Sequence, residues 1–517
     1  MVDYALILRQ VLDPELLLIV FATSIYGLVI GAIPGLTALM SVALLVPLVT
    51  FMDPIPAIAA IITASSMAIF SGDIPGALLR MPGTPASAAY TDDAYGLTRR
   101  GKSATALGAG LIASVAGGLL SACVLIFAAP SLATIALSFS SVEYFWLAVL
   151  GLSCAVFVGG PSLLKGLASL LLGLMFATIG MDPVGGIPRF TFGNPDLLSG
   201  LGLIPILIGF FAVSELLRSS QHLGTEERVQ VAGNQSLFRV MPGLLRRHKV
   251  GVLRGSAIGT IIGAIPGAGA DIAAWISYAI TRRVSKLGRL DSDEGAQERI
   301  MAASASNNAS VAGAYIPATV FGIPGDAITA IVISVMFLKG ISPGPTLFLR
   351  HPETIYTIFS IFFVANLVMI PMGALCIRGF GLIVRIPPAY IAPIILMFCI
   401  LGGFAVENTL FSVGVIGVIG LLGYMMEANE VPFAPAVLGL ILGPMIEQSF
   451  MTTMLKSQGN LMVFVERPLG AAFAVAAVLA WSVILLAKAF GRGRPDETAL
   501  PPRGTISTAH PVIKETK

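Results

Sequence analysis

The pentapeptide Gly31-Ala32-Ile33-Pro34-Gly35 recurs as Gly263-Ala264-Ile265-Pro266-Gly267, each time in the middle of a long apolar run. Proline lacks the N–H that closes a helical turn and glycine loosens the backbone, so each motif predicts a broken helix. Within a bilayer, a broken helix persists only where protein or a watery cavity covers its exposed peptide groups. Two such breaks at corresponding places of two halves are typical of a transporter's substrate site near the midplane.

The composition is that of a membrane protein. The chain has 517 residues, of which 56% are hydrophobic and 11% charged, and its mean hydropathy is +0.89. An average soluble protein is about 25% charged. A net charge of only +3 gives no reason to expect a nucleic-acid partner. The four cysteines stand singly in apolar stretches and the four histidines in polar connections, so we expect no metal site and no cofactor.

Apolar runs long enough to span a bilayer follow one another along nearly the whole chain. We predict an all-α polytopic membrane protein of about 11–13 membrane elements, some of them broken or re-entrant. Its expected parts are a first membrane repeat at 1–217, a cytoplasmic basic connection at 218–249, a second repeat with additional helices at 250–490, and a disordered polar tail at 491–517.

A second pair of motifs strengthens the repeat. Ile74-Pro75 is followed by Pro82-Gly83, and Ile316-Pro317 by Pro324-Gly325, with the same seven-residue step between the prolines. The same register places Ser65-Ser66 opposite Asn307-Asn308. Two ordered motifs shared by both halves predict that the halves fold alike.

Basic residues in the short loops indicate orientation, because cytoplasmic loops are enriched in lysine and arginine. The second Pro-Gly element has basic residues on both flanks, which predicts a hairpin that enters from the cytoplasm and returns. The first element has weakly basic flanks and is expected to enter from the opposite side. This pattern favours an inverted repeat over a parallel one. The flanking residues are Arg246, Arg247, Lys249 and Arg254 before the second element and Arg282, Arg283, Lys286 and Arg289 after it.

A helix that breaks in the membrane offers ligands at both ends of the break. Its new N-terminus carries free N–H groups that suit a carboxylate, and the unwound carbonyls suit Na⁺. Gly27 and Gly259, four residues before each motif, are instead expected to serve close helix packing. The predicted substrate-binding residues are Pro34, Gly35, Thr37, Ser65, Ser66, Arg80, Gly83, Thr84, Pro266, Gly267, Gly269, Asn307, Asn308, Pro324, Gly325 and Asp326.

Charged residues inside membrane segments are candidates for function. Arg80, two residues before Pro82, is placed to pair with a substrate carboxylate or to reach the membrane surface. Asp271 and Asp73 are candidates to bind a coupling ion, Na⁺ or H⁺; for Asp271 a surface-facing position is the alternative. Thr84 and Asp326 are also candidate N-caps of the helices that follow them. Glu447 is expected to be a structural partner.

Three blocks of sequence stand out together: the Gly-Ala-Ile-Pro-Gly block with Trp275-Ile276-Ser277-Tyr278, Ser306-Asn307-Asn308-Ala309 with Ile316-Pro317 and Gly322-Ile323-Pro324-Gly325, and Ala434-Pro435 with Leu438-Gly439-Leu440-Ile441-Leu442-Gly443-Pro444 to Glu447. With these blocks the chain resembles the large membrane subunit of the tripartite tricarboxylate transporters, from about residue 16 to 490. The resemblance implies a bacterial inner-membrane, multi-pass secondary transporter that is driven by a cation gradient. It also implies two partners, a small four-helix membrane subunit and a periplasmic solute-binding protein, and citrate-like organic anions as substrates.

The chain departs from the family pattern in places that bear on the identity of the carboxylate and on the coupling ion. Ser304 stands where a glutamate is expected, Arg80 and Asp271 stand where uncharged residues are expected, and Gln448 follows Glu447 in place of a basic residue. An organic-anion channel and an ion-coupled sensor subunit remain alternatives. An enzyme is not expected, because the chain has neither an HExxH nor a GxSxG motif.

Overall fold

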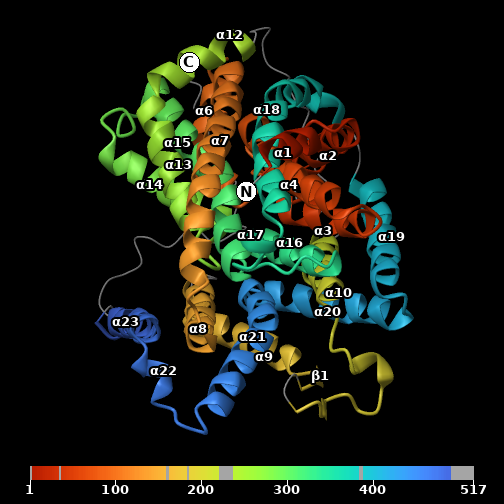
Figure 1. Ribbon diagram of the computed structural model, residues 1–517. Coiled ribbons are helices and arrows are strands. Elements are labelled where there is room, and N and C mark those ends of the chain that lie inside the picture. The colour runs from red at the N-terminus through yellow and green to blue at the C-terminus, as the bar shows by residue number, and fades with distance from the viewer. Residues whose placement is uncertain are drawn as a thin grey trace, which may run out of the picture.

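The computed structural model describes residues 3–33, 36–158, 162–182, 185–219, 237–383 and 388–490. These residues are mostly helical and include only two strands of two residues each, so the all-α prediction is confirmed (Figure 1). In this part of the chain, six segments are long and apolar enough to cross a membrane: Pro14–Ala32, Pro54–Leu79, Ser103–Ala136, Pro352–Gly381, Leu410–Ala428 and Ala434–Lys456. The strands β1 (Gly180–Met181) and β2 (Pro188–Arg189) form a two-residue antiparallel pair in a loop.

The first Pro-Gly element is a helical hairpin. Gly27 and Gly31 on α2 face Ala64 and Ala68 on α4, so both helices advance by four residues together and run parallel. The chain between them must therefore return, and α3 is the returning arm. The elements of this half up to its long helix are α1 (Tyr4–Val11), α2 (Pro14–Ala32), α3 (Ala38–Val49), α4 (Pro54–Ser71), α5 (Asp73–Leu79), η1 (Ser87–Ala89), α6 (Thr91–Arg99) and α7 (Ser103–Ala136).

The second Pro-Gly element repeats this arrangement. Gly259 and Gly263 on α13 face Ser306 and Ser310 on α15, again in parallel, with α14 as the returning arm. A Cβ at Gly259 would lie 2.2 Å from the Ser306 carbonyl oxygen, so the prediction that this glycine serves packing is confirmed. The elements are α12 (Leu237–Arg247), α13 (Lys249–Gly263), α14 (Gly269–Val284), α15 (Asp293–Phe321), α16 (Ala327–Leu338), α17 (Leu347–Arg350) and α18 (Pro352–Ile383).

The two halves exchange their long helices. Helix α7 of the first half packs along α15 of the second, and α18 of the second packs along α4 of the first. Gly118 on α7 meets Asn366 on α18, while Leu111 meets Gly373, so α7 and α18 run antiparallel. Because they hold equivalent places in their halves, the two halves are inverted relative to each other. Helices α4 and α15, between them, are buried along most of their length.

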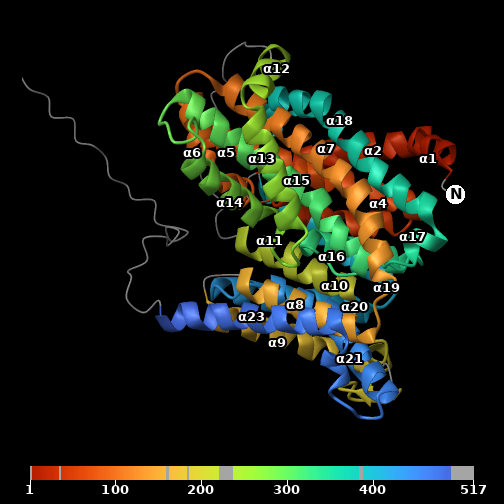
Figure 2. The same ribbon diagram turned by 60° about the vertical axis from the view of Figure 1, so that its left-hand side comes forward.

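The remaining helices form a second layer beneath the hairpins (Figure 2). Helix α21 packs on α8 and α9, while α20 packs on the segment from α10 to α11, which contains a π-helical turn at Ile208–Val213. The elements of this layer are α8 (Ser141–Val158), α9 (Leu163–Ala177), η2 (Pro195–Leu197), α10 (Leu203–Leu207), η3 (Ile208–Val213), α11 (Ser214–Ser219), α19 (Pro388–Glu407), α20 (Leu410–Ala428), α21 (Ala434–Lys456), α22 (Val463–Glu466) and α23 (Pro468–Phe490).

Each hairpin touches this second layer. Gly267, at the tip of the second hairpin, lies against Ala155 of α8, and Gly151 of α8 lies beside Pro266. On the first hairpin, Pro47 of α3 packs on Gly402 of α19. The lower helices therefore hold the hairpins from one side.

The predicted connection at 218–249 contains an amphipathic helix. Leu237, Met241 and Leu244 of α12 are buried, and Gly108 of α7 lies beside Met241 and Leu237. Residues 220–236 of this connection and the predicted tail at 491–517 lie outside the described residues. The predicted structural role of Glu447 fits the fold, because its carboxylate receives two hydrogen bonds from the Arg189 guanidinium, at 2.6 and 3.0 Å.

Candidate functional site

In the second half the two Pro-Gly motifs meet. The Gly267 N–H donates a 2.8 Å hydrogen bond to the Gly325 carbonyl oxygen. Gly267 and Gly269 have φ angles of 83° and 64°, in the left-handed region that glycine adopts without strain. Gly325 leaves no room for a side chain, since its Cβ would lie 2.6 Å from the Gly263 carbonyl oxygen. The hairpin tip and the loop after α15 thus form one compact backbone unit, which includes Pro266 and Pro324.

The first half has the matching contacts where it is described. The Gly83 N–H donates to the Gly72 carbonyl oxygen at 3.1 Å, and a Cβ at Gly83 would lie 3.2 Å from the Gly31 carbonyl oxygen. Pro34 and Gly35 lie outside the described residues. Thr37, just beyond them, caps α3 by accepting a hydrogen bond from the Met40 N–H at 3.2 Å.

The helices that begin near the motifs differ in whether a side chain caps the N-terminus. Asp326 caps α16 in a capping box with Thr329, and its Oδ1 accepts the Thr329 N–H at 2.8 Å. Helix α14 begins at Gly269 with no side-chain cap at Ala268. A substrate carboxylate at α16 would meet the charge of Asp326, and one at α14 would meet the charge of Asp271 in the first turn. The N-cap position of α14, Ala268, has no side chain that caps the helix. Thr84 also acts locally, accepting the Ser87 N–H at 3.1 Å.

The loop after Gly83 lies across α14 of the other half. Asp271 Oδ1 accepts the Ala86 N–H at 3.0 Å, and the Trp275 indole N–H donates to the Pro85 carbonyl oxygen at 3.1 Å. Asp271 is exposed and four residues past Gly267. The structure therefore brings the loop that follows Gly83 and Thr84 onto α14, about one turn beyond Gly267.

The two neighbouring asparagines, Asn307 and Asn308, differ in their hydrogen bonds. Asn308 donates from Nδ2 to the Ser114 carbonyl oxygen on α7 and to Asn366 Oδ1 on α18, both at 2.8 Å. Among the described residues, the buried Oδ1 atoms of Asn307 and Asn308 have no hydrogen-bond partner, and neither does the hydroxyl of Ser66. Ser65 donates to the Ile62 carbonyl oxygen of its own helix.

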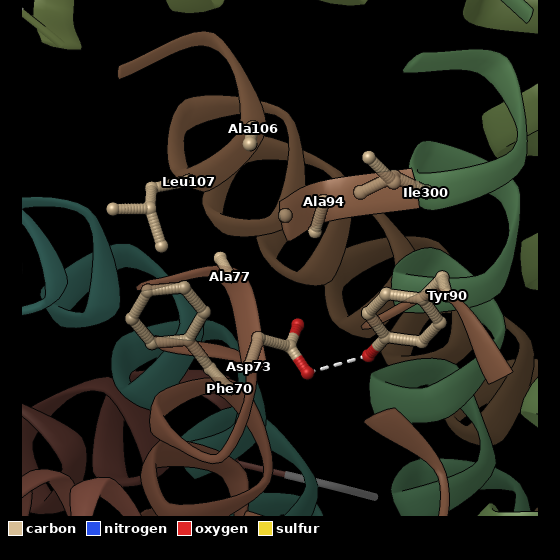
Figure 3. A pocket seen from close by; sticks show the side chains of 9 residues that line it. Phe70, Asp73, Ala77, Tyr90, Ala94, Ala106, Leu107 and Ile300 are labelled. Carbon is tan, nitrogen blue, oxygen red and sulfur yellow. Dashed lines mark hydrogen bonds between the residues drawn. The ribbon is translucent and has the colours of Figure 1, made fainter. Parts of the chain in front are cut away.

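Of the charged candidate residues, Arg80 lies at the surface and Asp73 in the interior. Arg80 is the C-cap of α5 and pairs with Asp92 at 2.9 Å, with 63% and 81% of the two side chains exposed. Asp73 is buried and accepts a 2.5 Å hydrogen bond from the Tyr90 hydroxyl (Figure 3). It also accepts a 3.3 Å hydrogen bond from the Ser304 hydroxyl. The predicted substrate arginine thus lies at the surface, and the candidate coupling residue lies inside.

Sequence reasoning missed the partners of the buried polar groups. Tyr90 and Ser114 carry no motif signal, since a tyrosine in a loop and a serine in an apolar run are common. Asn366 is a lone amide inside the apolar run of α18, and that isolation is a usable signal. In the described part of the chain, no three His, Cys, Asp or Glu side chains gather as metal ligands.

Comparison with known proteins identifies the family. Residues 17–438 match the family described as "Tripartite tricarboxylate transporter TctA family". The chain belongs to this family. The matched range contains both hairpins, both following Pro-Gly loops and the two long exchanged helices.

Two relatives come from Agrobacterium vitis. The "Uncharacterized 52.8 kDa protein in TAR-I ttuC' 3'region" is 30% identical over 471 residues, which cover 90% of this chain and 92% of the relative. The "Uncharacterized protein in TAR-II ttuC' 3'region" is 30% identical over 213 residues, which cover 41% of this chain and 88% of the relative. No solved structure matches this TctA-family chain significantly.

Proposed function

We propose that the chain is the large membrane subunit of a cation-coupled tripartite secondary transporter in the bacterial inner membrane. It imports tricarboxylates or related organic carboxylates by alternating access. It works with a small four-helix membrane subunit and a periplasmic solute-binding protein. Family membership supports the transporter class, and the inverted pair of Pro-Gly hairpins supports a binding site between the two halves.

The observation that carries this proposal is the junction of three motif segments. The second hairpin tip bonds through the Gly267 N–H to Gly325, and the loop after Gly83 bonds to α14 through Asp271 and Trp275. The uncapped start of α14 lies in this junction and presents backbone N–H groups, which suit a carboxylate. The proposed ligands of the anion are therefore backbone N–H groups and neutral side chains, and Asp271 in the first turn of α14 is the charged side chain beside them.

Neutral ligands fit a site that must bind and release its cargo in each cycle. A buried, fully paired charge on the protein would hold an anion tightly and cost several kcal/mol to expose. The predicted ligands Asn307 and Ser66 are neutral and buried, and the described structure gives the Asn307 carbonyl and the Ser66 hydroxyl no partner. They lie on α15 and α4, the two helices around which the inverted halves pack.

Counterflow tests this function. The chain is reconstituted into proteoliposomes with its two partners, the vesicles are loaded with unlabelled citrate, and labelled citrate is added outside. A carrier shows a transient accumulation of label that depends on internal citrate, because loaded sites exchange. An organic-anion channel gives equilibration without the transient, and an ion-coupled sensor gives no flux; either result, repeated over a panel of di- and tricarboxylates, contradicts the proposal.

A further inference from the structure

A buried acid lies where the two halves meet. Asp73 begins α5, directly after α4, and its carboxylate faces a small cavity with room for about one water molecule (Figure 3). The cavity is lined from both halves, because Ile300 of α15 completes a wall otherwise built by α4, α5, α6 and α7 with Tyr90. Its other lining residues are Phe70, Ala77, Ala94, Ala106, Leu107 and Gly110.

No cation balances this acid in the described structure. No lysine, arginine or histidine side chain lies within ion-pairing distance of Asp73 there. The nearest basic residue along the chain, Arg80, pairs with the exposed Asp92. Besides Asp73, Tyr90 is the one titratable group in the described cavity wall. The polar side chains that face this pair are those of Ser304 and Asn307, both on α15.

The surroundings suit a proton better than a sodium ion. Transporters hold Na⁺ with several oxygens, including carbonyls of unwound backbone. In the described cavity lining, the only side-chain oxygens are those of Asp73 and Tyr90. An unpaired carboxylate in an apolar setting is neutralised by a proton at far lower cost than it is kept ionised. The Ser304 hydroxyl can rotate from donor to acceptor, so it can serve both the ionised and the protonated acid.

We propose that Asp73 carries the coupling proton of this transporter, so that carboxylate import is driven by a proton gradient. This inference rests on the proposed function. One proton passes from periplasmic water to the Asp73 carboxylate when the carrier loads, and the same proton passes from the carboxylic acid to cytoplasmic water when it unloads. Tyr90 keeps its own proton throughout and positions the carboxylate.

The fold connects this acid to the Pro-Gly site. Gly72 precedes Asp73 and bonds to Gly83, while Tyr90 follows the same loop by seven residues. Ser304, on the other half, lies three residues before Asn307 on α15. A shift of the Gly83 loop or of α15 on anion binding therefore changes the hydrogen bonds and the hydration of Asp73. Protonation and anion binding are coupled through this short path.

The test compares Asp73→Asn with the matched exposed carboxylate variant Asp92→Asn in the reconstituted three-component system. In the wild type we expect an inward proton gradient to stimulate citrate accumulation several-fold, while a sodium gradient at equal pH does not. Asp73→Asn should lose the stimulation and keep counterflow, because the neutral amide mimics the protonated acid. Asp92→Asn should behave like the wild type.

Failure of this inference is distinguishable from failure of the proposed function. Absence of counterflow in the wild type overturns the function. Counterflow with sodium-driven accumulation, or with proton-driven accumulation that survives in Asp73→Asn, overturns the role of Asp73 alone.

If Asp73→Asn is inactive in every transport assay, proton uptake on citrate binding tests the role of Asp73 instead. A pH-indicator dye in weakly buffered detergent solution should report proton uptake by the wild-type and Asp92→Asn complexes when citrate binds. In Tyr90→Phe, the pH at which proton uptake is largest should differ from that of the wild type. Absence of proton uptake by the wild type overturns the proposal.

Discussion

The two neighbouring amides on α15 are expected to respond differently to truncation. Asn307 has a buried carbonyl without a partner in the described structure, which suits a ligand contact. Asn307→Ala should leave membrane abundance and thermal stability close to the wild type. Citrate uptake should fall about tenfold or more, because a hydrogen bond to a charged group contributes about 1.5–3 kcal/mol. Uptake by vesicles, normalised to protein abundance, measures the effect.

Asn308→Ala provides the contrast for that variant. Its amide joins α15 to α7 and α18 through Ser114 and Asn366. The loss of both bonds should lower the thermal unfolding temperature, at a cost of about 1–2 kcal/mol. Normal uptake in Asn307→Ala would remove that residue from the anion site, and equal stability losses in both variants would make the pair purely structural.

Single charges were the hardest residues to predict. Arg80 and Asp73 both stand near Pro-Gly motifs in the sequence, yet one is exposed and the other buried. The difference arises because Arg80 ends α5 with a φ of 60°, which leaves its side chain at the surface beside Asp92. Asp73 faces Tyr90 and Ser304, which are 17 and 231 residues away. A hydropathy pattern cannot predict such contacts, because they depend on how the two halves pack against each other.

At the scale of the element, the stripe of glycines on α13 governs its fit to α15. A Cβ at Gly259 would lie 2.2 Å from the Ser306 carbonyl oxygen, which belongs to a buried helix and cannot move freely. Gly259→Ala should therefore destabilise the protein by about 1–3 kcal/mol, as overpacking does. Thermal unfolding of the purified protein in detergent, followed by tryptophan fluorescence, measures the change.

Gly414 on α20 is the matched control. A Cβ at this glycine would have no atom of the described neighbouring residues within 4 Å, so Gly414→Ala adds only helix propensity, worth up to about 1 kcal/mol. Its unfolding temperature should stay level or rise. An unchanged unfolding temperature for Gly259→Ala would show that α13 and α15 pack less closely than the structure has them.

The hairpins were predictable from the sequence, but their neighbours were not. Pro-Gly pairs within apolar runs imply a break, and basic flanks on both sides imply a return, so α13 and α14 follow from local chemistry. The partner of each hairpin depends on long-range contacts. Helix α7 packs on α15, and α18 packs on α4. Hydropathy does not predict these partners, because α7 and α18 are apolar over most of their length.

For the whole molecule, ion pairs at the start of α15 join the second half to the first. Arg299 of α15 donates to Asp93 of α6 at 2.6 Å, and Lys102 and Arg100, beside α7, pair with Asp293. Hydrogen bonding to Lys102 holds the pKa of the Asp293 carboxyl below its usual range. These contacts align α7 with α15 in parallel, and the antiparallel contact of α7 with α18 then inverts the second half.

Inversion predicts that the open ends of the two hairpins lie on opposite sides of the membrane. Asp53, between α3 and α4, and Lys286, between α14 and α15, are exposed, and Asp53 makes no capping hydrogen bond. In a background with the four native cysteines replaced by alanine, Asp53→Cys should react with an impermeant maleimide from the periplasm. Lys286→Cys should react only after permeabilisation, because the basic flanks predict a cytoplasmic position for that end. Both variants should label fully in permeabilised cells, which controls for burial. Labelling of both cysteines from the same side would mean that the hairpins enter together, and a site built from opposed hairpins would have to be abandoned.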